Sequence, residues 1–165
     1  MNYQYYPGCS LEGTALEYNR STGALMQAVG AKLLEIEDWT CCGASAANST
    51  SRLLAHALPA RNLALAEKND EVTDILVPCS ACYLNLKQVE EEIKNNQPTL
   101  DRLNQVLVEE QLQLRGSVRV RHLLDVLSRD IGSKRIRDLR TRNLSPWRIA
   151  PYYGCQCLRP FVIFD

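Results

Sequence analysis

Residues 71–82 read EVTDILVPCSAC, and this stretch joins a strand, a stop and the start of a helix. The run from Thr73 to Val77 is nearly all apolar, as in strands of a parallel sheet that are buried on both faces. Pro78 cannot extend a central strand, because it has no N–H to donate. Cys79 then opens the next element. The stretch predicts a buried strand followed directly by cysteines.

The same order of strand, cysteine and helix occurs twice upstream. Residues 3–6 form a short aromatic run that Pro7-Gly8 closes before Cys9. Residues 31–36 form another predicted strand, which leads into the loop at residues 39–43. Shorter strands are predicted at residues 118–120 and 149–153.

Apolar residues at helical spacing fill the segments between these strands. A helix over residues 11–29 ends at Gly30, and Ser49 to Ser51 cap a helix that Pro59 should kink or divide. The helices are predicted over residues 11–29, 51–68, 80–94, from 98 onward and 122–131. Because strands alternate with helices, the predicted fold is α/β, with a mostly parallel sheet flanked by helices.

The composition limits the classes of partner. The chain has 165 residues, enough for one domain with a real core, and its 19 basic residues balance 19 acidic ones. A neutral balance gives no electrostatic signal for nucleic acid or for an anionic membrane. The N-terminus shows no signal-peptide pattern, and no apolar run approaches the roughly 18 residues of a spanning helix. We therefore expect a cytoplasmic protein without a membrane span.

Five of the seven cysteines form one spaced set: Cys9, Cys41, Cys42, Cys79 and Cys82. Cys9, the pair Cys41-Cys42 and Cys79 each follow a predicted strand, and the carboxyl ends of parallel strands are where such sheets bind ligands. Thiolate sulfur is a soft ligand that selects zinc, copper(I) or iron–sulfur clusters. Because a structural zinc uses four ligands, five sulfurs favour an iron–sulfur centre. We predict that all five bind metal.

Neighbouring residues suit this role. Gly8 and Gly43 flank the ligands and allow the backbone to approach a bulky centre. Cys79 and Cys82 stand at a helix start, where the helix dipole stabilises thiolates. Trp39 is expected to pack beside the site. His56 and His122 stand alone on predicted helices and are read as structural.

Three other interpretations compete with a cluster. A disulfide network is unfavourable in a reducing compartment. Structural zinc on four of the five thiolates stays open as an alternative cofactor. A thioredoxin-like role for Cys79-Ser80-Ala81-Cys82 would leave the other three cysteines without a function.

A short repeat suggests a second unit. Residues 5–9, YYPGC, are echoed by residues 152–155, YYGC, again at the end of a predicted strand. We therefore expect one domain over residues 1–147 and the start of a second, truncated repeat over residues 148–165. Cys155 belongs to that start, and Cys157 has no partner that the sequence identifies.

The spacing of Cys9, Cys41-Cys42-Gly43 and Cys79-x-x-Cys82 closely resembles the cysteine-rich CCG domain. The best-known bearer of this domain is the B subunit of heterodisulfide reductase. Relatives occur in glycolate oxidase, anaerobic glycerol-3-phosphate dehydrogenase and thiol:fumarate or succinate dehydrogenase subunits. Members usually carry two such motifs. The resemblance covers nearly all of the chain, and residues 151–156 with Arg159-Pro160 look like the opening of the second motif.

The resemblance implies a fold, a cofactor and partners. The five cysteines would ligate a non-cubane [4Fe-4S] cluster in an oxidoreductase that acts on a sulfur group, reducing or forming a disulfide of small thiols. A ferredoxin-like C subunit and a flavin-containing A subunit would supply electrons. This sequence holds the first motif but only Cys155 of the second, so the chain alone should be inactive in catalysis.

Two further functions remain open at this point: a non-catalytic electron-relay module with one cluster, and a structural zinc domain of the same fold. No residue identifies the thiol substrate, the direction of the reaction, the oligomeric state or the source of the second repeat.

Overall fold

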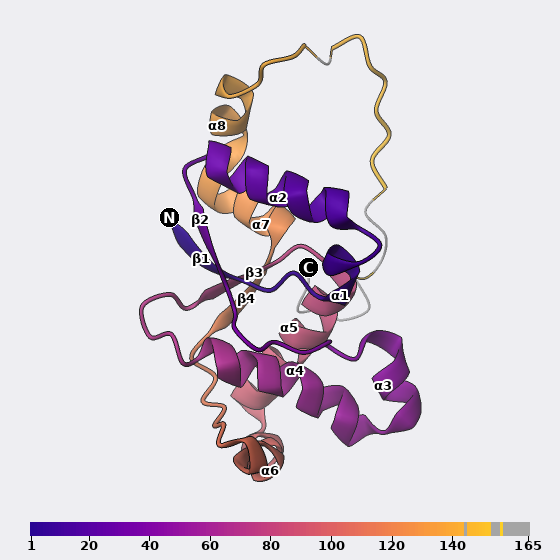
Figure 1. The fold of residues 1–165 in the computed structure, drawn as a ribbon, viewed down its shortest axis with the longest axis vertical. Coiled ribbons are helices and arrows are strands. Elements are labelled where there is room, and N and C mark those ends of the chain that lie inside the picture. The colour runs from indigo at the N-terminus through magenta and orange to yellow at the C-terminus, as the bar shows by residue number, and fades with distance from the viewer. Residues whose placement is uncertain (144, 153–155, 157–165) are drawn as a thin grey trace.

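The computed structural model describes residues 1–143, 145–152 and 156, and its centre is a four-stranded parallel sheet (Figure 1). The strands lie in the order β2-β1-β3-β4. Their bounds are β1 Asn2–Tyr5, β2 Lys32–Glu35, β3 Asp74–Val77 and β4 Arg119–His122. The parallel register places Tyr3 beside Leu33, and Ile75 beside Val120. The predicted α/β fold with a parallel sheet is confirmed.

Helices cover both faces of this sheet, with α2 and α7 on one face and α4, α5 and α6 on the other (Figure 1). Their bounds are α1 Cys9–Glu12, α2 Leu16–Ala28, α3 Ala44–Thr50, α4 Arg52–Ala66, α5 Ser80–Asn95, α6 Gln97–Leu107, α7 Leu123–Val126 and α8 Gly132–Asp138. A 3₁₀ turn at Val108–Glu110 follows α6, and a π-helical segment at Leu127–Ile131 joins α7 to α8.

The central strand β3 contributes to two cores. Ile75 and Val77 pack with Leu63 and Leu86 on the side of α4 and α5. Leu76 points the other way and packs with Met26 on the side of α2. Since successive residues of a strand face opposite sides, a strand covered on both sides must be apolar throughout. This explains why residues 75–77 show no polar alternation.

Four details differ from the sequence prediction. The helix expected over residues 11–29 is two helices, α1 and α2, separated by Gly13-Thr14-Ala15. α4 begins after Ser51, which caps it as expected, but it runs through Pro59 without dividing. α3 was not predicted. His122 ends β4 instead of opening the next helix.

The predicted strand at residues 149–153 falls partly outside the described residues. Residues 149–152 are exposed and belong to no strand, and residues 153–155 are not described. The boundary at residue 147 and the second repeat therefore stay predictions.

The order of the strands determines where a site can form. β1 is hydrogen-bonded to β2 on one side and to β3 on the other, so the chain reverses its direction of winding at β1. In open parallel sheets the loops beside such a switch point diverge and leave a crevice at the carboxyl ends of the strands. The cysteines follow β1, β2 and β3, the strands that border this point.

Candidate metal centre

Three loops bring the five predicted cysteines to the carboxyl edge of the sheet. Cys9 is the first residue of α1, directly after β1 and the Pro7-Gly8 turn. Cys41 and Cys42 lie in the loop between β2 and α3. Cys79 is the N-cap of α5, and Cys82 lies in the first turn of this helix.

The sulfur atoms of this set form close pairs between the loops. The Sγ atoms of Cys9 and Cys41 are 3.6 Å apart. The Sγ atoms of Cys42 and Cys82 are 3.5 Å apart. Cys82 also makes a side-chain hydrogen bond with Cys79. The structure thus brings all five predicted cysteines together at one end of the sheet.

The set runs from the protein surface into the core. Cys9 and Cys41 are exposed and Cys79 is half-buried, whereas Cys42 and Cys82 are 1% and 3% exposed. Cys42 and Cys82 pack within the apolar cluster on the side of α4 and α5. The side of the site with Cys9 and Cys41 is therefore open to solvent, and the side with Cys42 and Cys82 is shielded from water.

Hydrogen bonds distribute protons unevenly among the inner thiols. The Cys82 thiol lowers the pKa of Cys79 to about 6, with help from the backbone N–H groups of Ala81 and Cys82 at the start of α5. The same thiol lowers the pKa of Cys42 to about 7, helped by the backbone N–H of Ala44. The pKa of Cys82 is raised in return by these two hydrogen bonds. Cys79 is thereby the most acidic of the three inner thiols, and its thiolate is the form that binds metals.

At the exposed rim, the pKa of Cys9 is raised, chiefly by its hydrogen bond with Cys41. Tyr6 lies below the sulfurs, and burial together with the neighbouring thiols raises the pKa of its hydroxyl, which therefore stays protonated.

Two glycines in the cysteine loops leave no space for a side chain. Gly8 has φ +75°, and a Cβ at this position would lie 2.6 Å from the Cys82 Sγ. Gly43 has φ +81°, and its Cβ would lie 2.7 Å from the Ala47 Cβ. Any side chain at either residue would therefore be strained and would push against the site.

Polar side chains hold the loop that carries the tandem cysteines. Asn62, fully buried on α4, binds both backbone groups of Thr40, and Tyr6 donates its hydroxyl to the Thr40 carbonyl at 2.6 Å. The Tyr6 ring packs edge-on against Trp39, with 5.2 Å between ring centroids. From the other side, Asn85 on α5 donates to the carbonyl oxygens of Cys42 and Ala44.

Neither asparagine was predicted from the sequence. Asn62 is the easier of the two to notice, because it is the only polar residue in the buried run from residue 62 to residue 66. Asn85 stands on a mixed polar face of α5 and gives no such signal. Trp39, predicted to pack beside the site, lies there as expected.

The donor set can be tested against the metal groups it was predicted to hold. All five donors are sulfur, which fits a soft metal, and Gly8 leaves room beside the Cys82 sulfur. Among the described residues, no three His, Cys, Asp or Glu side chains surround one point closely enough to hold a single ion. The three loops supply five sulfur donors, one more than the four that a structural zinc uses.

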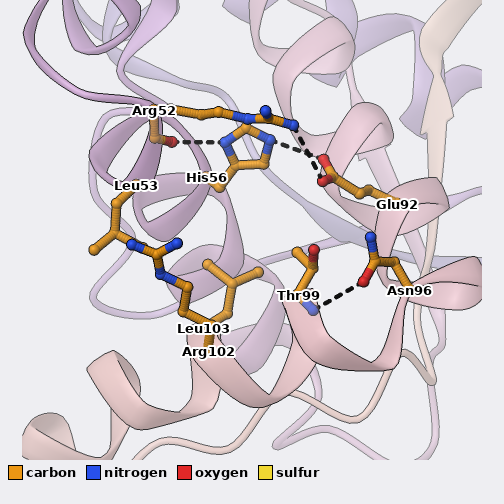
Figure 2. A pocket seen from close by; sticks show the side chains of 8 residues that line it. All are labelled: Arg52, Leu53, His56, Glu92, Asn96, Thr99, Arg102 and Leu103. Carbon is orange, nitrogen blue, oxygen red and sulfur yellow. Dashed lines mark hydrogen bonds and ion pairs between the residues drawn. The ribbon is translucent and has the colours of Figure 1, made fainter.

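The two histidines are held by hydrogen bonds with other parts of the chain. His56 lines a pocket of about 270 Å³ between α4, α5 and α6. Figure 2 shows its ring between Arg52 and Glu92. Its Nε2 lies 2.8 Å from Glu92, and its Nδ1 lies 2.7 Å from the Arg52 carbonyl. His122 is buried, and its Nδ1 accepts the Leu124 N–H at 3.2 Å. Cys155 and Cys157 lie outside the described residues.

A second shallow hollow, near the exposed sulfurs, is acidic. It is lined by Trp39 and Ile36 together with Glu12, Glu35, Glu37 and Asp38. Within the described part of the chain, every helix is too short or too polar to span a membrane.

Comparisons with known proteins identify relatives of the chain. The chain is 35% identical over 158 residues to the 8-methylmenaquinol:fumarate reductase membrane anchor subunit of Wolinella succinogenes, covering 96% of this chain and 54% of the relative. It is 26% identical over 156 residues to the B subunit of the CoB-CoM heterodisulfide reductase of Methanosarcina acetivorans, covering 94% of this chain and 51% of that relative. The chain thus spans about half the length of these curated relatives.

A solved structure shares the fold. The crystal structure of a hypothetical protein from Helicobacter pylori matches 74% of this chain and 24% of its own, with a TM-score of 0.61 and 20% sequence identity. At this identity the match supports the α/β architecture alone.

The family model described as the cysteine-rich domain, CCG, matches residues 3–87. This region is just over half of the chain, and it contains the five cysteines that the structure gathers. The chain therefore belongs to the cysteine-rich CCG domain family.

Proposed function

We propose that the five cysteines hold an iron–sulfur cluster, of the non-cubane [4Fe-4S] type, and that the chain is the redox part of a heterodisulfide-reductase-like complex. One observation carries this proposal: sulfurs from three separate loops pair at 3.5 and 3.6 Å at the carboxyl edge of the sheet. Relatives named as the B subunits of heterodisulfide reductases support the assignment to sulfur chemistry.

The residues of the chain have distinct roles in this proposal. Cys42, Cys79 and Cys82 anchor the cluster on the dry side, where the thiolates of Cys42 and Cys79 are already stabilised. Cys9 and Cys41 hold the exposed side. The half-buried N-terminus of α5 donates backbone N–H groups to the Cys79 sulfur, and such donors adjust the reduction potential of a cluster. When bound, the cluster would supply electrons and an iron site that takes up a sulfur of the disulfide.

Partners follow from the length of the relatives. Because this chain spans about half of each, we propose that a second cysteine-rich repeat completes the catalytic site, with a ferredoxin-like C subunit and a flavin-containing A subunit as electron donors. The chain alone should then bind its cluster but not turn over a disulfide. We propose a cytoplasmic location, with any membrane contact made through the complex.

Electron relay is the second candidate function. The relative at 35% identity is named as part of a menaquinol:fumarate reductase, and this name contains no thiol or disulfide. In that role, the cluster would pass electrons between a quinol-oxidising partner and a fumarate-reducing one, and the exposed Cys9 and Cys41 side would face a protein instead of a small thiol.

Metal analysis tests the shared part of both proposals. The chain is purified without oxygen, and iron, acid-labile sulfide and zinc are measured per chain, together with the visible spectrum. We expect about four irons per chain and a broad brown absorbance. Cys41→Ser should lower the iron content, whereas Cys157→Ser, the matched thiol control, should not. Stoichiometric zinc without sulfide would overturn the cluster and leave the structural zinc domain.

A thiol titration separates catalysis from relay. Oxidised protein, assembled with its second repeat, is mixed with a small thiol and followed by electron paramagnetic resonance. A new paramagnetic signal that broadens with ³³S-labelled thiol supports sulfur binding at the cluster. A signal that responds to quinol but not to thiol supports relay.

A further inference from the structure

The backbone just before the tandem cysteines is held by one side chain. Asn62 on α4 accepts the Thr40 N–H at Oδ1, at 2.8 Å, and donates from Nδ2 to the Thr40 carbonyl at 2.9 Å. The amide of Asn62 thus gives Thr40 one acceptor and one donor, the same two hydrogen bonds that the backbone of a neighbouring β-strand would give. Asn62 is fully buried, so water cannot replace either hydrogen bond.

Tyr6 reinforces the same point. Its hydroxyl donates to the Thr40 carbonyl at 2.6 Å, and Asn62 Nδ2 reaches the Tyr6 oxygen at 3.4 Å and the Leu58 carbonyl at 3.2 Å. Thr40 is thereby tied both to α4 and to the end of β1. Since Cys41 follows Thr40 directly, this tie limits where its sulfur can lie.

A second asparagine holds the other end of the turn. Asn85 on α5 donates from Nδ2 to the Cys42 carbonyl at 3.2 Å and to the Ala44 carbonyl at 3.3 Å. The same nitrogen lies 3.7 Å from the Cys42 sulfur. The peptide that carries the tandem cysteines is therefore restrained from both sides, by two helices that pack against each other.

We propose that Asn62 and Asn85 are positioning residues, which hold the turn at Cys41 and Cys42 in the conformation that the metal centre requires. The inference rests on the proposed function, because positioning matters only if these sulfurs bind a metal. Residues that support the ligands of a metal site from behind change metal affinity by about 10- to 100-fold when they are replaced.

The chain provides a matched control in Asn104. This residue on α6 binds Leu114 in the same two-point way, with its Nδ2 3.0 Å from the Leu114 carbonyl and its Oδ1 2.8 Å from the Leu114 N–H. Leu114 is buried, but it lies in the segment after α6 and carries no predicted ligand. Asn104→Leu therefore removes an equal restraint far from the sulfurs.

The first measurement is the rate at which iron is lost to a chelator. Asn62→Leu, Asn85→Leu and Asn104→Leu are prepared without oxygen, and each loaded chain is mixed with excess EDTA. The urea midpoint of each metal-free chain is recorded alongside. We expect iron loss to quicken by about tenfold or more in the first two variants and to stay unchanged in Asn104→Leu. Equal rates in all three variants at similar urea midpoints would show that the two asparagines act only through global stability.

The conservative variant Asn62→Asp refines this result. It keeps the shape and the acceptor of the side chain but loses the N–H that binds the Thr40 carbonyl. If the two-point hydrogen bond is what matters, Asn62→Asp should lose iron about as fast as Asn62→Leu. Because a protonated carboxyl could donate to the Thr40 carbonyl in place of the N–H, the rate is measured over a range of pH. A rate equal to that of the unaltered chain at every pH would overturn the proposed role of the donor.

The second measurement does not depend on iron. Amide hydrogen exchange of the metal-free chain is followed at Thr40 and at Leu114. Asn62→Leu should speed exchange at Thr40 by about tenfold while Leu114 stays protected, and Asn104→Leu should do the reverse. A chain that binds no iron but protects Thr40 would reject the proposed function and leave the restraint standing. Unchanged Thr40 exchange in Asn62→Leu would overturn the restraint, even in a chain full of iron.

Discussion

The sulfur of Cys42 lies 3.5 Å from the sulfur of Cys82, although 40 positions separate the two residues in sequence. Cys42 belongs to the loop after β2 and Cys82 to the first turn of α5, so this contact joins two segments on opposite sides of β1. Both side chains are buried in the core on the side of α4 and α5. The inner half of the site is thus part of the folded core and not an appendage to it.

Gly8→Ala should damage the site and the fold together. A Cβ at residue 8 would lie 2.6 Å from the Cys82 sulfur, and the backbone there has φ +75°. With ψ +158° this backbone is in a region that essentially only glycine adopts, which costs alanine about 1–3 kcal/mol, and the overpacking adds about 1–3 kcal/mol. Gly30→Ala is the control, because Gly30 has φ +80° with nothing near its Cβ position. Both variants are compared by urea unfolding. Equal losses in the free energy of unfolding would show that the contact with the Cys82 sulfur adds no destabilisation.

Glu67→Gln should destabilise the chain without touching the sulfurs. The buried Glu67 carboxylate accepts the backbone N–H groups of Arg115, Gly116 and Ser117 at 2.6 to 2.7 Å. An amide would turn an N–H toward one of these donors, so we expect a loss of about 2–4 kcal/mol in the free energy of unfolding. Glu109→Gln, at an exposed position, should cost almost nothing. A similar small effect for Glu67→Gln would contradict the structural role of this carboxylate.

Acid should weaken the chain through the carboxylates around Arg121. Asp130 binds this buried guanidinium at 2.9 Å and also accepts the Tyr3 hydroxyl at 2.6 Å. The hydrogen bonds from Arg121 hold the pKa of Asp130 below its ordinary value. A carboxylate with a lowered pKa in the folded state stabilises the fold above the unfolded-state pKa of about 3.9, and this stability is lost as the pH falls toward the folded-state pKa.

The unfolding free energy should therefore decrease between about pH 5 and pH 2. Asp130→Asn should flatten that decrease, because it removes a group that takes up a proton on unfolding. The measurement is urea unfolding at several pH values, with Asp138→Asn as a surface control. An unaltered pH slope in Asp130→Asn would mean that other carboxylates carry the acid response.

The isolated chain should associate with itself. Near its C-terminal end, Trp147, Ile149 and Tyr152 are 71%, 69% and 93% exposed, and such an apolar surface favours contact with a partner. We expect dimers or larger species in size-exclusion chromatography with light scattering, and a shift toward monomer for Trp147→Ser together with Ile149→Ser. A monomer at all concentrations would show that these exposed side chains do not drive self-association.

The parts of the fold that were predicted correctly share a strong local signal. The strands around Tyr3, Leu33 and Ile75 were found because each apolar run ends at a glycine, proline or cysteine loop. The break between α1 and α2 was missed because the apolar spacing continues across Gly13, while the tertiary fold makes α1 a single turn that presents Cys9. α3 was missed because ASAANST has no apolar period. Pro59 did not divide α4, since the buried helix keeps its other hydrogen bonds and its packing.

The residues of the candidate site also divide into those that the sequence predicted and those that it did not. Cysteines are rare and chemically distinct, so their spacing alone predicted which five would meet. Asn62 and Asn85 could not be predicted, because asparagine is common at caps and turns and its role here depends on which backbone groups the folded chain leaves unpaired. Sequence patterns thus identify residues that can bind a metal more readily than the residues that hold those ligands in position.

Helix α4 is fixed at both ends of its inner face. Asn62 ties it to the loop at the carboxyl edge of the sheet, and Glu67, just beyond its last turn, ties it to residues 115–117 at the opposite edge. A helix pinned at two edges can neither slide nor rotate without breaking buried hydrogen bonds. In the proposed cluster site, α4 is therefore expected to keep its position when the cluster takes up an electron, because a shift would break buried hydrogen bonds at both of its ends.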